Sequence, residues 1–178
     1  MHQLLLLRHA KAAPAEAGGP DRERPLNAFG RRAATTLRRT MRELGLVPDL
    51  VLVSTARRTL ETLEALEPWD DTPLIEPMDE LYLASAARLL DALRGVAETV
   101  RGVLLIGHNP GLHDLAMELA GPGLSAAPLA VALRAGFPTA ALAEYAITGP
   151  WSRLARGSAG GSGRLVRLLT PRGLKEPD

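Results

Sequence analysis

The amino-acid sequence predicts an α/β fold with three layers, in which helices cover both faces of a mostly parallel sheet. Three short runs of Leu, Val and Ile, at 4–7, 50–53 and 103–106, contain no polar residue. Such continuous apolar runs are typical of strands buried on both faces, as the central strands of a parallel sheet are. Helical patterns separate the runs, and strands that alternate with helices indicate parallel pairing.

Residues that start or stop helices delimit the other elements of the first two thirds of the chain. Asn27 can cap a helix that Gly45 ends, and Ser54 or Thr55 can cap the helix after the second strand. The predicted elements are a loop at 12–25, helices at 27–44 and 54–66, an extended segment at 73–77, a helix at 85–100, a turn at 107–111 and a helix from there to residue 119.

The last third has a different pattern, with strands predicted at 129–133, 140–147 and 164–169. The stretch 157–163 consists of Gly, Ser and Ala, which predicts a flexible loop. We find no internal repeat in the sequence. The length of 178 residues suits a single domain over 1–178.

Composition excludes several classes of protein. The chain has no cysteine, so disulfides, thiolate catalysis and Cys-ligated zinc are excluded. The net charge of +1 gives no general reason to expect nucleic acid or an anionic membrane as a partner. The run 4–7 is too short for a signal-peptide core or a membrane span, and no later run approaches the length of a span. We therefore expect a soluble, cytoplasmic protein.

Polar residues follow each of the three apolar runs. Arg8 and His9 come after the first, the stretch 54–58 after the second, and His108 and Asn109 after the third. Ligand sites of open α/β sheets form at the carboxyl ends of the strands. The sequence therefore predicts that two histidines and several arginines from three separate segments meet in one place.

This combination of side chains suits a phosphoryl group. Arginine donates in a planar, bidentate manner to phosphate oxygens. A neutral histidine nitrogen can attack phosphorus and carry the phosphoryl group, while a second, protonated histidine stabilises its oxygens. The helices that start after Ser54 and Pro110 would also direct free N–H groups toward an anion.

Each feature also has a simpler interpretation. Arg8 and His9 alone could form a surface ion pair and an ordinary hydrogen bond, Arg58 and its neighbour Arg57 could lie on a solvated helix face, and His108 could cap a helix. Metal binding by the two histidines is a further alternative, but neighbouring arginines repel a cation and no HExxH spacing is present. The coincidence at three successive strand ends favours the phosphoryl site.

At this point the motifs resemble the histidine phosphatase superfamily, whose fold is called phosphoglycerate-mutase-like. Residues 5–10 are similar to its first strand and Arg-His-Gly motif, with Ala10 in place of Gly. Ser54, Arg58 and Thr62 are similar to its Ser-x-x-x-Arg-x-x-x-Thr element, and 107–111 resembles its second histidine motif. The resemblance implies that His9 is the nucleophile and that Arg8, Arg58, His108 and Asn109 bind the phosphoryl group, with no metal or cofactor.

Three further features resemble the small bacterial branch that contains the SixA-type protein phosphohistidine phosphatases. They are the short length, the segment 21–30, which is similar to Asp-x-x-Arg-Pro-Leu-Thr-x-x-Gly with Asn27 for Thr, and the ending 164–171. The segment 79–82 is similar to the one that supplies an acidic proton donor elsewhere in the superfamily. We expect Glu80 to be that acid, with Asp79 and Glu76 as alternatives, although a solvated carboxylate is the simpler interpretation of Glu80.

The expected function is therefore that of a phosphatase acting on phosphohistidine in a partner protein. A small-molecule phosphomonoesterase is the alternative, and a mutase or a phosphate-binding module without turnover is less favoured. An alkoxide leaving group needs a proton donor such as Glu80 far more than an imidazole does, because the imidazole pKa is about 6.5. Whether the loop 12–25 closes over the site is left open at this point.

Overall fold

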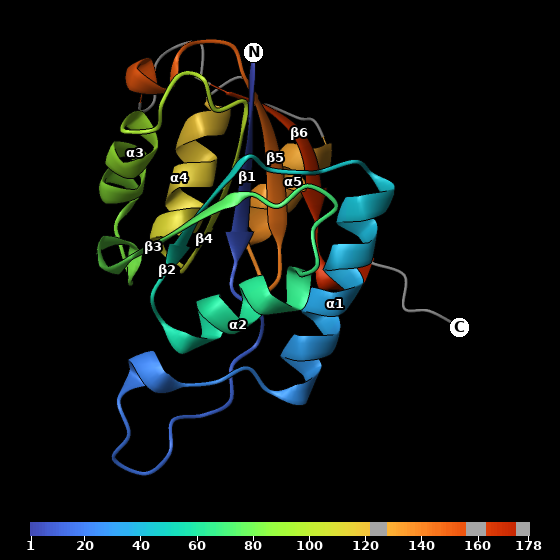
Figure 1. The fold of residues 1–178 in the computed structure, drawn as a ribbon, viewed down its shortest axis with the longest axis vertical. Coiled ribbons are helices and arrows are strands. Elements are labelled where there is room, and N and C mark those ends of the chain that lie inside the picture. Colours follow the sequence, from blue (N-terminus) through green and yellow to red (C-terminus); the bar gives the residue numbers. More distant parts are fainter. Residues whose placement is uncertain (122–127, 156–162, 174–178) are drawn as a thin grey trace.

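One six-stranded sheet organises the chain in its structure, a computed structural model that describes residues 1–121, 128–155 and 163–173 (Figure 1). The strand order is β3-β2-β4-β1-β5-β6. The first four strands run parallel, whereas β5 pairs antiparallel with both β1 and β6. The strands are β1 (His2–Arg8), β2 (Leu50–Ser54), β3 (Leu74–Met78), β4 (Gly102–Gly107), β5 (Leu142–Ile147) and β6 (Gly163–Leu169).

Helices pack on both faces of this sheet. The helices are α1 (Ala28–Glu43), α2 (Arg57–Leu66), α3 (Ala86–Arg94), α4 (Gly111–Ala120) and α5 (Pro128–Ala135), with short 3-10 turns η1 (Asp21–Glu23), η2 (Asp79–Leu81), η3 (Trp151–Arg153) and η4 (Pro171–Gly173). Leu5 and Leu7 of β1 pack in a core with residues of α1 and α2, while Leu4 and Leu6 pack in a core with residues of α3, α4 and α5. The predicted three-layer α/β architecture with a mostly parallel sheet is confirmed.

The predicted N-cap of α1 is confirmed, whereas that of α2 is wrong. The side chain of Asn27 accepts a hydrogen bond from the Gly30 amide at 2.7 Å, and Ser85 caps α3. The helix α2 has Ala56 at its N-cap and no side-chain cap, so the prediction of Ser54 or Thr55 as its cap is wrong. Their hydroxyls bond other partners: Ser54 contacts His108, and Thr55 contacts Arg22 and Asp79.

Two other predicted elements need correction. The segment predicted as a strand at 129–133 forms the helix α5, because Pro128 occupies its first position, alanines favour a helix, and the buried residues Ala130 and Leu133 have helical spacing. The helix predicted to reach residue 100 ends at Arg94, with Gly95 as its C-cap. The Gly/Ser-rich loop predicted at 157–163 lies outside the described residues except for Gly163, which begins β6.

A glycine contact brings a distant segment to the start of α4. A Cβ atom at Gly111 would lie 1.9 Å from the Ala84 carbonyl oxygen, so only glycine permits this approach. The segment that carries Tyr82 therefore packs beside His108, at the carboxyl end of β4. Within the described ranges, none of the helices has the length and hydropathy of a transmembrane segment.

Candidate active site

Three parallel strands that lie side by side end at the candidate site. The order β2-β4-β1 brings Ser54, His108 and His9 to one edge of the sheet, because neighbouring parallel strands end at the same edge. The ring centroids of His9 and His108 are 5.2 Å apart. The sheet thus brings together both histidines that the sequence places at strand ends.

His9 has the protonation state of a nucleophile. Its ring is almost fully buried, and its Nδ1 lies 2.7 Å from the carbonyl oxygen of Ala10. A carbonyl oxygen only accepts, so Nδ1 carries the proton and Nε2 keeps its lone pair. Burial, together with the positive charges of Arg58 and Arg8, lowers the pKa of His9 from 6.5 to about 4. The ring is therefore neutral near pH 7.

His108 lies between Ser54 and Arg58. Arg58 donates from Nη2 toward Nδ1 of His108 at 3.4 Å, so Nε2 carries the ring proton and donates to the Ser54 hydroxyl at 2.8 Å. Burial, together with electrostatic repulsion from His9 and Arg58, lowers the pKa of His108 to about 3. In this structure His108 is therefore neutral near pH 7, whereas the sequence analysis expected a protonated second histidine. A bound phosphoryl dianion would raise the pKa of His108.

Asp21 is a site residue to which the sequence analysis gave no role. Its carbonyl oxygen accepts from Nη1 of Arg58 at 2.8 Å and its carboxylate accepts from Nη2 at 3.0 Å, while the Tyr82 hydroxyl donates to the same carboxylate at 2.6 Å. The Tyr82 hydrogen bond holds the pKa of Asp21 well below its usual range, and those from Arg24 and Arg58 act in the same direction. Asp21 is therefore a carboxylate anion beside the candidate phosphate-binding arginine.

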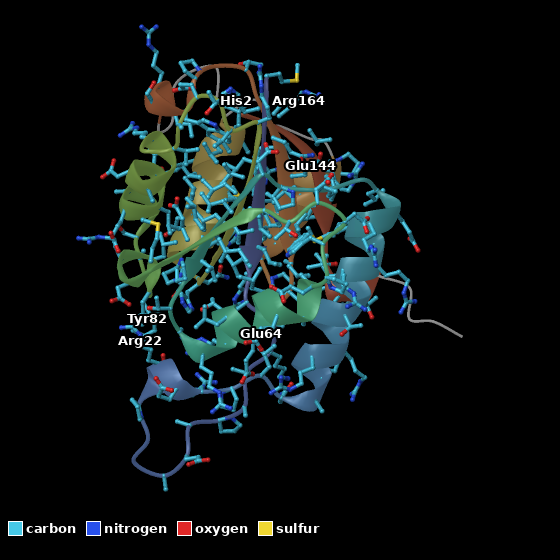
Figure 2. The ribbon with its side chains drawn as sticks, viewed as in Figure 1. His2, Arg22, Glu64, Tyr82, Glu144 and Arg164 are labelled. Atoms are coloured by element: carbon cyan, nitrogen blue, oxygen red, sulfur yellow. The ribbon has the colours of Figure 1, made fainter. Side chains whose placement is uncertain are left out.

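The surroundings of Tyr82 tie the 12–25 loop to the site. Its ring lies edge-on to that of His108, with centroids 5.5 Å apart, and the guanidinium of Arg22 lies 5.1 Å from the ring centroid. Arg22 also bonds Thr55 and Asp79. Figure 2 shows Tyr82 and Arg22 together at one end of the molecule, far from His2 and Arg164 at the other.

Thr62 joins the nucleophile to the arginine segment. Its hydroxyl donates to the Arg58 carbonyl at 2.6 Å and accepts from the Ala10 amide at 3.0 Å. Thr62 is fully buried, so these bonds have no competition from water. One side chain thus fixes the residue after His9 relative to the first turn of α2.

Arg8 and Asn109 share one anchor at the rim of the site. Nη1 of Arg8 and Nδ2 of Asn109 donate to the carbonyl oxygen of Phe137, at 3.0 and 2.8 Å. The Nε of Arg8 and the Oδ1 of Asn109 are buried and have no hydrogen-bond partner in the described part of the structure. Each of these residues is therefore next to a site histidine in the sequence and has one buried polar atom that these bonds leave unused.

The predicted acids lie outside this cluster. Glu80 is exposed in η2 and lines a separate cavity of about 500 Å³ with Ser85 and Arg88. Asp79 bonds Arg22 and Thr55, and Glu76 is exposed in the edge strand β3. The carboxylate that the fold brings into the cluster is Asp21. The sequence motif at 21–30 includes Asp21, but nothing in that motif indicates that Asp21 contacts Arg58.

The cluster combines the cations Arg58 and Arg8 with the neutral ring of His9. Arg58 is almost fully buried, and its charge together with that of Arg8 lowers the pKa values of both histidines. Among the described residues, no group of three or more His, Asp or Glu side chains has the arrangement of a metal site. Such a cluster can bind a phosphoryl dianion, orient it in line with Nε2 of His9 and stabilise its charge.

Comparisons with known proteins point to one family. A family model described as the histidine phosphatase superfamily (branch 1) matches residues 4–81. The structure of a candidate phosphohistidine phosphatase SixA from Nakamurella multipartitia has 30% sequence identity, covers 96% of both chains and superposes with a TM-score of 0.82. A candidate SixA phosphohistidine phosphatase from Agrobacterium tumefaciens has 32% identity over 96% of this chain and 98% of its own, with a TM-score of 0.80.

A third similar structure has a bound oxyanion. It is that of the protein histidine phosphatase SixA complexed with tungstate, at 26% identity over 97% of this chain and 99% of its own, with a TM-score of 0.75. All three comparisons extend over nearly the whole chain, including the parts that form the candidate site.

Proposed function

The chain belongs to the histidine phosphatase superfamily, and on that premise we propose that it hydrolyses phosphoryl groups through a covalent phosphohistidine on His9, without a metal. The observation that carries this proposal is the hydrogen bond from Nδ1 of His9 to the Ala10 carbonyl. It leaves a lone pair on Nε2 in a cluster that contains the buried cation Arg58. A neutral nitrogen beside fixed positive charge is what attack on a phosphoryl dianion requires.

The first chemical step forms one bond and breaks another. Nε2 of His9 attacks phosphorus in line, an N–P bond forms, and the bond between phosphorus and the leaving group breaks with its electron pair going to the leaving group. Arg58, Arg8 and Asn109 bind the phosphoryl oxygens, and His108 donates to them once the dianion has raised its pKa. Positioning and charge stabilisation supply most of the rate enhancement.

In the second step, water attacks the phosphorus of phospho-His9. The N–P bond breaks, its electrons return to Nε2, and inorganic phosphate leaves. A base that takes the proton of this water accelerates the step. We propose Glu80 for that role and for the protonation of an alkoxide leaving group, although its side chain lies outside the cluster, in a separate cavity.

We propose phosphohistidine in a partner protein as the substrate. The three similar SixA structures support this class, and so does the state of the acid in the cluster. Asp21 remains ionised because its pKa is lowered, so it gives a leaving group no proton. An imidazole leaving group, with a pKa of about 6.5, tolerates the lack of a proton donor within the cluster far better than an alkoxide does.

A small-molecule phosphomonoesterase is the second candidate, favoured by one observation. A cavity of about 720 Å³ adjoins Arg8 and Asn109, and this volume is typical of small-ligand sites. A substrate whose phosphoryl group reaches His9 could place the rest of its atoms there.

The test compares the wild type with His9→Ala, in EDTA, on a phosphohistidine-bearing protein and on an aryl phosphate. We expect phosphate release that falls by about 10³-fold or more in His9→Ala, together with an acid-labile phosphoenzyme in the wild type only. His2→Gln is the control, because it alters a histidine at the opposite edge of the sheet. Unchanged release by His9→Ala would overturn the mechanism, and one equivalent of phosphate without turnover would indicate a binding module instead.

A further inference from the structure

A cavity of about 720 Å³ lies beside the active site, and the charged residues that line it are all cations. We call it the side cavity. Three of its fourteen lining residues are the cations Arg8, Lys11 and Arg172, and none is a carboxylate. Apolar groups form much of the remaining wall, among them Phe29, Phe137 and Pro171. A cavity with apolar and cationic walls, and no acid, suits a ligand that is both apolar and anionic.

The side cavity and the candidate active site share residues. Arg8 directly precedes His9 in the sequence, and Asn109 directly follows His108. Arg8 and Asn109 both line the side cavity. Both donate to the Phe137 carbonyl, whose residue forms part of the wall. The side cavity therefore begins directly beside the two histidines of the candidate active site.

Within the described part of the chain, the two outer cations have no acidic partner. Among the described residues, neither Lys11 nor Arg172 forms an ion pair, and the contact recorded for Lys11 is with the ring of Phe29, at 5.7 Å from its centroid. Both cations are exposed. They remain available to a carboxylate of a ligand.

The acids near the active site belong to a different segment. Asp21 and Asp79 bond Arg58 and Arg22 beside Tyr82, and none of these residues lines the side cavity. The carboxylates near the active site thus lie on the side of Tyr82, whereas the cations Lys11 and Arg172 lie at the side cavity. A substrate with an anionic group is favoured only in the orientation that directs this group to the side cavity.

We propose that the side cavity binds an acidic and apolar segment of the phosphorylated partner protein, next to its phosphohistidine; this rests on the proposed function and names its partner chemistry. The volume exceeds what a phosphoryl group or a single side chain fills. Phe29 at the rim has 49% of its surface exposed, and large exposed aromatic residues are typical of protein interfaces. A partner segment with carboxylates would cover Phe29 and pair with Lys11 and Arg172.

The experiment uses three phosphohistidine peptides that differ only beside the phosphorylated residue, where they carry Glu, Ser or Lys. The enzymes are the wild type, Lys11→Ala/Arg172→Ala, and the control Arg153→Ala/Arg164→Ala, which removes the same charge from exposed positions in η3 and β6. We expect the wild type to prefer the Glu peptide and the test variant to lose about tenfold in kcat/KM on it, mainly through KM. High salt should remove the preference.

A charge reversal sharpens the test. Lys11→Glu/Arg172→Glu should prefer the Lys peptide, while activity on an aryl phosphate too small to reach the side cavity stays unchanged. Equal kcat/KM for the three peptides in the wild type would overturn the proposal, as would equal losses on all substrates in the test variant. A loss of kcat/KM confined to small anionic phosphomonoesters, with none on the peptides, would contradict the proposal that the partner is a protein.

Binding of the unphosphorylated Glu peptide, measured by fluorescence anisotropy, separates the two proposals. If the wild type turns over no substrate, the phosphatase proposal fails, and the side cavity is still tested by this binding. We expect the test variant to weaken the binding and the control variant to leave it unchanged. Equal binding of the Glu and Lys peptides would overturn the side-cavity proposal whatever the activity.

Discussion

Asp21 holds the guanidinium of Arg58 through two different acceptors, its backbone carbonyl at 2.8 Å and its carboxylate at 3.0 Å. Arg58 is almost fully buried, whereas the side chain of Asp21 is 45% exposed. The carboxylate also accepts from Tyr82 and Arg24. A negative charge on the 12–25 loop therefore lies in hydrogen-bond contact with the arginine that is proposed to bind the phosphoryl group.

Asp21→Asn should tighten the binding of inorganic phosphate about fivefold at low salt, because it removes a negative charge that repels the anion but keeps an acceptor for Arg58. Calorimetry with phosphate measures this change. Asp70→Asn is the control, since Asp70 pairs with Arg42 on the surface. Weaker binding by Asp21→Asn would show instead that the carboxylate serves mainly to orient Arg58.

Thr62→Val should lower the free energy of unfolding by about 1–3 kcal/mol, because the buried Ala10 amide loses its acceptor. It should also reduce kcat, since the backbone after His9 is no longer tied to α2. Thr35→Val is a matched control: the Thr35 hydroxyl donates to the Arg31 carbonyl one turn earlier, as that of Thr62 does to Arg58, but it is exposed. Denaturant unfolding and steady-state kinetics measure both effects. Similar losses in the two variants would contradict the bridging role of Thr62.

His9 and His108 should titrate far below an ordinary histidine, at about 4 and about 3. Ring proton and carbon NMR signals, assigned with His9→Ala, measure both values. The unfolded chain binds these protons near pH 6.5 and the folded chain only near the lowered values, so the free energy of unfolding should decrease as the pH falls from 6.5 toward 4. Activity should persist well below pH 6.5, because His9 keeps its lone pair. A His9 signal that titrates near 6.5 would contradict the buried, neutral ring.

Glu80→Gln should slow the hydrolysis of alkyl phosphates about 10²-fold and leave phosphohistidine nearly unaffected, because an alkoxide needs a proton donor and an imidazole does not. Glu43→Gln, at an exposed carboxylate in the last turn of α1, is the control. Parallel steady-state assays on both substrates measure the ratio. Equal losses on the two substrates, or none on either, would remove Glu80 from the mechanism.

The strands and their ends were predictable because the information is local. A run such as 103–106 is apolar throughout and is followed at once by Gly107 and His108, so strand, edge and polar residue are all encoded within a few positions. The helix α5 was missed because its run at 129–133 is also apolar, and a short apolar run does not distinguish a strand from a buried helix. Pro128 was the local signal for the helix.

Contacts between distant segments were not predictable in the same way. The bond from Arg58 to Asp21 spans 37 positions, and that from Arg8 to Phe137 spans 129. Both depend on how a loop lies against the sheet edge, which no pattern within the loop encodes. Ser54 and Thr55 show the reverse case: both precede the N-cap residue Ala56, and their hydroxyls bond His108 and Asp79 instead of capping α2.

The Phe137 carbonyl that anchors Arg8 and Asn109 belongs to the backbone, and this has a consequence for divergence. A mutation at position 137 replaces the side chain that lines the side cavity but retains the oxygen that both residues bind. Substitutions at position 137 can therefore change the shape of the cavity without removing the hydrogen bond that orients Arg8. Such a division lets new substrate preferences arise by single substitutions, without loss of the chemistry at His9 in the intermediate forms.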